Sequence, residues 1–190
     1  MESFPISVSL DAQAVLANTP FLLTRCSADL RYVFVSEAYA AMIGRRAEDM
    51  AGQKIVDIMG DEGFQTIRPH VEAVLAGHRV EYETEVHFQG VGPRLLHVIY
   101  TPEKDPLGAV RGWIASIIDI TERRRAQERI AILRGQIDDV LDRAVDARGL
   151  NRHVLIDKAL SLHRELLLVE ATTPAAAFPS PDDPKPPPSA

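Results

Sequence analysis

The sequence predicts an α+β domain, a five-stranded antiparallel sheet with short helices on one face, followed by a helical hairpin. Three observations support this prediction. Two short β-rich runs come before a group of short helical segments, and three longer β-rich runs come after them. The segment after the last run has apolar residues at heptad spacing. The last twenty residues hold seven of the chain's thirteen prolines, which predicts an extended, disordered tail.

These patterns divide the 190 residues into four predicted parts. Residues 1–19 form a leader with a short cap helix. Residues 20–120 form the mixed α and β domain, and residues 121–170 form two helices. Residues 171–190 form the proline-rich tail.

The first half of the domain has two predicted strands, Phe21–Cys26 and Arg31–Val35, rich in residues that favour β-structure. Ser36 then has the character of an N-cap for a short helix over Glu37–Ile43, because its hydroxyl accepts bonds from unpaired backbone N–H groups. Two further short helical pieces follow, at Ala47–Met50 and Gln53–Met59.

A longer helix is predicted over about residues 62–76. Pro69 falls within it, and proline is best tolerated in the first turn of a helix. We therefore expect the regular part of this helix to begin near Pro69.

The second half has three predicted strands. Val80–Phe88 alternates between apolar residues and a face with Glu81, Glu83 and Glu85, the pattern of a half-buried strand. The next strand is predicted over Leu95–Thr101. The third strand, Val110–Ile118, is apolar on both faces, so we expect a central position in the sheet.

Composition limits the function. The net charge of −6 argues against a nucleic-acid binder that works through bulk positive charge, so we expect no nucleic-acid partner. The single cysteine, Cys26, has no partner for an internal disulfide. The chain shows neither a signal-peptide pattern nor an apolar run of the roughly 20 residues that a membrane span needs. These features predict a cytoplasmic protein.

Three segments, in this order, resemble the PAS family, in particular the bacterial sensory-box type associated with histidine kinases. They are Tyr32–Tyr39 (YVFVSEAY), Val71–Gly77 (VEAVLAG) and Gly112–Arg123 (GWIASIIDITER). Ser36 stands where the family often has Asn. The resemblance implies a sensory and interaction module without catalytic residues, which binds a small ligand or none, dimerises, and passes a signal into the following helix. It also implies that Asp119 and Thr121 form the junction that transmits the signal.

By the same resemblance, a pocket lies between the sheet and the helices. Either a small apolar ligand or the protein's own side chains would fill it. Its predicted lining comprises apolar and aromatic residues: Tyr39, Met42, Ile55, Ile58, Ile67, Val71, Tyr82, Val98, Trp113, Ala115 and Ile117.

No residue requires a cofactor. A flavin photosensor of this family needs a reactive cysteine among the short helices, and the corresponding segment Gln53–Gly60 has none. His70 is the one candidate for an axial haem ligand on the long helix, and it lies at the edge of that helix's apolar arc. The other histidines have no metal-ligand spacing, so no metal site is predicted.

The helical extension has the heptad spacing of a hairpin that pairs with another copy, which predicts a homodimer through a coiled coil or four-helix bundle. The predicted contact residues are Ile130, Leu133, Ile137, Val140, Leu155, Leu162 and Leu166.

The leading functional prediction is therefore a non-enzymatic signal-transduction protein of a two-component pathway, with a histidine kinase or response regulator as partner. Two alternatives stay open beside it. One is a response-regulator phosphatase or phosphotransfer protein that uses the hairpin, with His163 as phosphoacceptor. The other is a sensor of haem or another small ligand.

Overall fold

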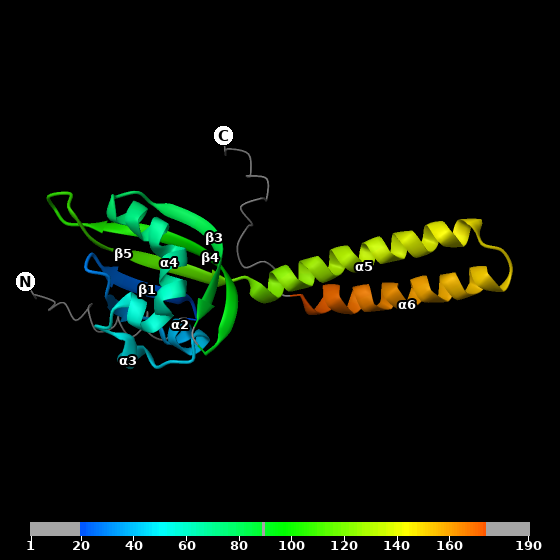
Figure 1. Cartoon of the computed structure of the whole chain (residues 1–190), viewed down its shortest axis with the longest axis horizontal. Coiled ribbons are helices and arrows are strands. Elements are labelled where there is room, and N and C mark those ends of the chain that lie inside the picture. The colour runs from blue at the N-terminus through cyan, green and yellow to red at the C-terminus, as the bar shows by residue number, and fades with distance from the viewer. Residues whose placement is uncertain (1–19, 89, 174–190) are drawn as a thin grey trace, which may run out of the picture. The chain divides into compact units, whose positions relative to one another are not determined.

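The computed structural model describes residues 20–88 and 90–173. The chain forms two compact units, divided after Thr121. The first is the mixed α and β domain, and the second is a pair of helices (Figure 1). The predicted leader and the tail from residue 174 onward lie outside the described residues.

The first unit contains the predicted five-stranded antiparallel sheet, with strands in the order β2-β1-β5-β4-β3. The central position predicted for the third long strand, β5, is confirmed. The predicted end of β4 at Thr101 is wrong, because pairing with β5 continues to Lys104. The strand bounds are β1 Leu22–Ser27, β2 Tyr32–Val35, β3 Val80–Phe88, β4 Gly92–Lys104 and β5 Val110–Asp119.

Three helices pack on one face of this sheet: α2 Glu37–Met42, α3 Ala47–Met50 and α4 Ile55–Leu75 (Figure 1). The core between them is dominated by large side chains with almost no exposed surface, which supply most of the apolar burial that stabilises the domain. They include Trp113, Met50, Ile55, Val71, Val74 and Val86.

Ser36 confirms its predicted role as N-cap of α2. Its Oγ accepts a hydrogen bond from the Tyr39 N–H at 3.3 Å and another from the Leu23 N–H at 3.0 Å. It donates one to the Phe21 carbonyl at 2.9 Å. One buried hydroxyl therefore joins the start of α2 to β1.

The prediction that the long helix becomes regular near Pro69 is wrong. Within α4 only Gly60 departs from helical backbone angles, with φ 78°, and Pro69 lies well inside the helix. The apolar side of α4 is buried on both sides of the proline, at Ile67 and Val71. Packing of this side against the sheet outweighs the roughly 3 kcal/mol that an interior proline costs.

The second unit consists of α5 Thr121–Asp146 and α6 Leu150–Thr172, which run antiparallel side by side (Figure 1). Ion pairs connect Arg129 with Glu165 and, at 2.9 Å, Arg134 with Glu170. The predicted helical hairpin is confirmed, and α6 extends two residues past its predicted end at 170. None of the helices within residues 20–88 and 90–173 has the length and apolar character required to cross a membrane.

Candidate functional site

A cavity lies inside the first unit, walled by the sheet and by α2 and α4. Its free volume is about 30 Å³, room for about two or three water molecules. A larger ligand would enter only if the lining side chains moved. Sixteen residues line the cavity: Thr24, Cys26, Tyr32, Tyr39, Ile55, Met59, Ile67, Tyr82, Val86, Phe88, Leu96, Val98, Tyr100, Trp113, Ala115 and Ile117.

Eight of the eleven predicted pocket residues are among this lining. The other three, Met42, Ile58 and Val71, pack in the core without lining the cavity. Two lining residues that the prediction missed, Leu96 and Tyr100, lie two positions before and after Val98 on β4. Residues two positions apart in a strand point to the same face, so the position of Val98 already indicated that both residues face the cavity.

The polar groups of the cavity come mainly from four tyrosines. The Tyr32 and Tyr39 hydroxyls share a hydrogen bond of 3.2 Å. The rings of Tyr82 and Tyr100 meet edge to face at 5.4 Å between centroids. Burial raises the pKa of all four phenols, so they remain uncharged near neutral pH.

The Tyr82 hydroxyl is buried, and it forms no hydrogen bond of ordinary geometry with any described residue. The neighbouring Tyr100 hydroxyl lowers the Tyr82 pKa and so opposes part of the rise that burial causes. The distance and angles between the two hydroxyls nevertheless do not form a hydrogen bond. The cavity thus contains one neutral polar group with unused bonding capacity.

Cys26 is a buried wall residue, only 2% exposed, and its sulfur lies 3.7 Å from the Thr24 hydroxyl. Burial raises the pKa of this thiol to about 12. The thiol stays protonated near neutral pH and packs as a small apolar group. It lies on β1, far along the chain from the segment where a flavin-reactive cysteine would be needed.

His70 does not line the cavity. Its ring stacks on the Tyr82 ring, with 3.5 Å between centroids and 10° between planes. Partial burial lowers the pKa of His70, which favours the neutral ring. The predicted candidate for a haem ligand therefore contacts the ring of a cavity residue and is not itself part of the cavity lining.

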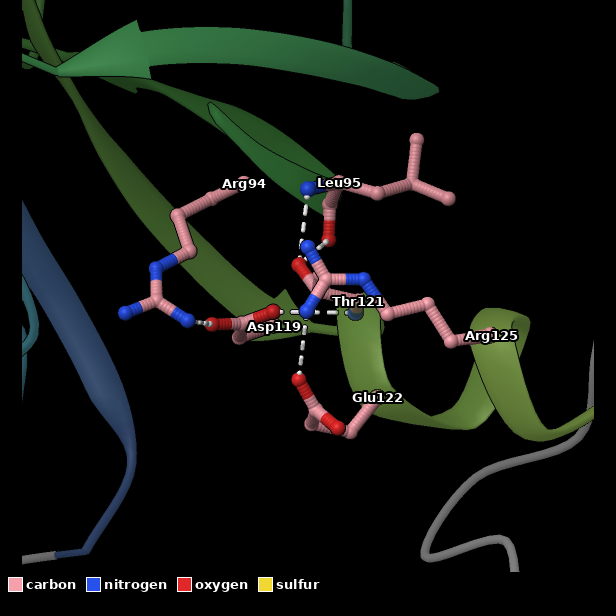
Figure 2. A network of polar contacts seen from close by, with 6 residues as sticks. All are labelled: Arg94, Leu95, Asp119, Thr121, Glu122 and Arg125. Atoms are coloured by element: carbon pink, nitrogen blue, oxygen red, sulfur yellow. Dashed lines mark hydrogen bonds and ion pairs between the residues drawn. The ribbon is translucent and has the colours of Figure 1, made fainter. Parts of the chain in front are cut away.

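A second site lies where β5 passes into α5. Figure 2 shows that the Thr121 side chain reaches back to β4, where its Oγ1 accepts a hydrogen bond from the Leu95 N–H at 2.8 Å. The Ile120 N–H donates to the Leu95 carbonyl at 2.9 Å. Both backbone groups of Leu95 are therefore bound to the two residues that follow β5.

Asp119 completes this junction. One of its carboxylate oxygens accepts the Thr121 N–H at 2.9 Å, and the other lies 3.7 Å from the Arg94 guanidinium (Figure 2). Thr121 is only 6% exposed. The two predicted junction residues thus lie in one network that connects β4, β5 and the first residue of α5.

The seven predicted contact residues of the extension lie along the inner sides of α5 and α6. Leu133, Val140 and Leu166 are buried, whereas Ile130, Ile137, Leu155 and Leu162 are half-buried. His163 is exposed on α6.

The face of the sheet opposite the helices holds a cluster of one histidine and two glutamates that the sequence did not predict. His97 on β4 is 9% exposed, with its ring nitrogens 3.4 Å from Glu81 and 3.6 Å from Glu83 on β3. Within the part of the chain that the structure describes, no group of histidine, cysteine or acidic side chains is placed to hold a metal ion.

Solved structures share this architecture at low sequence identity. VqmA from Vibrio cholerae, in a complex with ligand and DNA, matches with a TM-score of 0.53 and 20% identity over 62% of this chain. This chain covers 54% of that protein's length. An RNA-binding light-oxygen-voltage receptor matches with a TM-score of 0.53 and 17% identity, over 65% of this chain and 37% of the receptor. Since such neighbours include nucleic-acid binders, they lend no support to the expected absence of a nucleic-acid partner.

A PAS domain from Colwellia psychrerythraea matches with a TM-score of 0.53 and 12% identity, over 61% of this chain and 99% of that domain. No curated protein matches the chain. The family model described as the PAS fold matches residues 16–125, more than half of the chain. The sheet, the helices on one face, the cavity between them and the Asp119–Thr121 junction therefore belong to a member of the PAS fold family.

Proposed function

We propose that this chain is a non-enzymatic signalling adaptor of a two-component pathway, in which the PAS domain senses and the helical hairpin acts by protein–protein contact. PAS domains are generally sensory and not catalytic, and this supports the first half of the proposal. The observation that carries the second half is the junction. A shift of β4 against β5 changes the Leu95 contacts of Ile120 and Thr121, and thereby the first residue of α5.

We further propose that the cavity binds a small, largely apolar ligand with one hydrogen-bonding group. The free Tyr82 hydroxyl and the apolar walls favour such a molecule. Native mass spectrometry of freshly purified full chain tests this. The expected result is extra mass that is released on denaturation, and protein of unmodified mass in every preparation would contradict it.

The proposed action of the hairpin on partner proteins is tested with purified histidine kinases and response regulators from the same organism. An adaptor changes the rate of kinase autophosphorylation, or binds one regulator, without itself gaining phosphate. The matched variant Thr121→Val keeps the side-chain shape, removes the hydroxyl that binds Leu95, and should reduce this effect. If no kinase or regulator responds to the protein, the proposal fails.

The same reactions examine the enzymatic alternative, for which His163 exposed on α6 is the specific observation. Phosphotransfer predicts acid-labile phosphate on the chain that is lost in His163→Gln. A phosphatase predicts faster loss of phosphate from a receiver domain. The adaptor proposal predicts neither result.

A further inference from the structure

Two of the sixteen residues that line the cavity also reach the surface of the PAS unit. Tyr82 on β3 and Ile117 on β5 are half-buried, whereas the other lining residues are all buried. The shortest way from solvent into the cavity therefore leads past one of these two side chains.

Tyr82 is the better placed of the two to act as an entrance. It lies on β3, an edge strand with a single neighbour, while Ile117 lies on β5 in the middle of the sheet. The Ile117 side chain is branched at Cβ, so its rotation is restricted. The Tyr82 hydroxyl has no hydrogen bond with any described residue, so outward rotation of its ring breaks none.

Contacts with two other rings hold the Tyr82 ring in place. The His70 ring of α4 lies parallel to it, with 3.5 Å between centroids and 10° between planes. The Tyr100 ring of β4 meets it edge to face. Such pairs stabilise an arrangement beyond the area that they bury. Because His70 is half-buried and is not part of the cavity lining, it secures the Tyr82 ring from outside the cavity.

The cavity behind this ring is uncharged. None of the sixteen lining residues, all within the described part of the chain, is acidic, basic or a histidine. Burial raises the pKa of the four phenols and of the Cys26 thiol, so none of them is ionised near neutral pH. An ion that entered would lose its hydration shell without gaining an opposite charge, which is costly.

We propose that the Tyr82 ring is the gate of the cavity, that the stacked His70 ring holds this gate closed, and that the open gate admits small uncharged molecules and excludes ions. The inference rests on the proposed function, in which the cavity binds a small ligand. It adds the route of entry, the residue that controls entry and the charge of the ligand class.

Trp113 provides a signal for the state of the gate. It is the chain's one tryptophan, it lines the cavity and it is only 1% exposed. Its ring centroid lies 5.9 Å from that of Tyr100, which in turn contacts the Tyr82 ring. A quencher dissolved in the solvent reaches Trp113 more often as the population of open molecules rises. The bimolecular quenching constant therefore measures opening.

The test compares quenching of Trp113 fluorescence in the full chain by acrylamide, an uncharged amide, and by iodide, an anion. His70→Gln keeps a polar side chain without a ring, and it should raise the acrylamide quenching constant at least about threefold because the stack no longer favours the closed state. His70→Phe restores a ring and should stay within about twofold of wild type. The matched control His78→Gln makes the first change at an exposed histidine outside the lining and should leave the constant unchanged.

Iodide should quench every one of these proteins much less than acrylamide does. Strong iodide quenching of wild type would contradict an entrance that excludes ions. An acrylamide constant in His70→Gln equal to that of wild type would show that His70 does not hold the gate. If iodide reaches Trp113 in His70→Gln alone, that variant has unfolded, and His70→Leu, which also lacks a ring, replaces it.

Tyr82→Phe separates the gate from the proposed ligand. It keeps the ring and removes the hydroxyl, so acrylamide quenching should stay near wild type while native mass spectrometry detects less bound ligand. If a ligand is found and no His70 variant changes the quenching, the gate is wrong and the proposed sensing stands. If the His70 variants behave as expected and no preparation contains a ligand, the gate stands and the proposed ligand is wrong.

Discussion

Two buried side-chain hydroxyl groups, those of Ser36 and Thr121, connect separate elements of the PAS unit. Ser36 and Thr121 each satisfy backbone groups of a distant strand, Ser36 on β1 and Thr121 on β4. Each hydroxyl forms hydrogen bonds with backbone N–H or carbonyl groups that a neighbouring strand would supply elsewhere in the sheet. A lost hydroxyl at such a site leaves buried donors and acceptors unpaired, which costs more than the bond itself contributes.

Replacement of Ser36 by alanine should therefore destabilise the PAS unit by about 2 kcal/mol or more, since three hydrogen bonds are lost at a fully buried site. Urea unfolding followed by fluorescence measures the change. Ser27→Ala is the control, because the Ser27 hydroxyl bonds at an exposed turn and should cost under about 0.5 kcal/mol. Equal effects of the two substitutions would show that the buried network is not the cause.

Cys26 gives a prediction for alkaline pH. Its folded pKa of about 12 lies above the ordinary value of 9.0, so the unfolded chain loses its thiol proton first. The free energy of unfolding should be unaffected by this group below about pH 9 and should fall progressively between pH 9 and 12. At pH 10 the loss from Cys26 is about 1.4 kcal/mol.

Comparison of wild type with Cys26→Ala in urea at pH 8 and pH 10 isolates this effect. The difference in unfolding free energy between the two pH values should be smaller in the variant by about that amount. Identical pH dependence in both proteins would mean that the thiol is not buried as described.

At the scale of elements, strand contacts depend on side-chain size at single positions. Gly112 on β5 pairs with Ser27 on β1, and a Cβ at Gly112 would lie 2.1 Å from the Cys26 carbonyl oxygen. Close approach of two backbones thus requires glycine there. Gly135 on α5 is the opposite case, since a Cβ at this position meets no atom within 4 Å.

The substitution Gly112→Ala should disrupt the pairing of β1 with β5 and destabilise the PAS unit by about 3 kcal/mol or more. Gly135→Ala should stabilise the hairpin by up to about 1 kcal/mol, because alanine favours a helix interior. Thermal unfolding of the two variants measures both shifts. A Gly112→Ala protein as stable as wild type would contradict the described register.

At the scale of the whole molecule, the division after Thr121 predicts two separable unfolding events. Trp113 is the chain's one tryptophan and is 1% exposed in the PAS unit, so fluorescence follows that unit. Circular dichroism at 222 nm follows mainly α5 and α6. The two signals should give different midpoints in urea, and Ser36→Ala should move only the fluorescence midpoint. Midpoints that coincide and shift together would show one cooperative unit.

Much of the architecture was predictable because secondary structure follows local periods. The alternation of β3, the Ser36 cap and the heptads of α5 and α6 are all readable within a few residues of sequence. Eight predicted pocket residues line the cavity because the resemblance to the PAS family indicated which positions of the strands and helices face it. The path of α4 through Pro69 was not predictable, because contacts with the sheet outweigh a local penalty.

By itself, the sequence determined the order of strands and helices, the apolar side of each, and the residues at which β5 passes into α5. Only the tertiary structure decided which partner each group meets. In the folded chain the Thr121 hydroxyl accepts a hydrogen bond from the Leu95 N–H, and the Tyr82 hydroxyl forms none. The His70 ring stacks on the Tyr82 ring and does not line the cavity. The tertiary structure also divided the apolar residues of α6 between a side covered by α5 and an exposed side. The physical reason is that periodicity is a property of neighbouring residues, whereas these contacts join residues far apart in the chain.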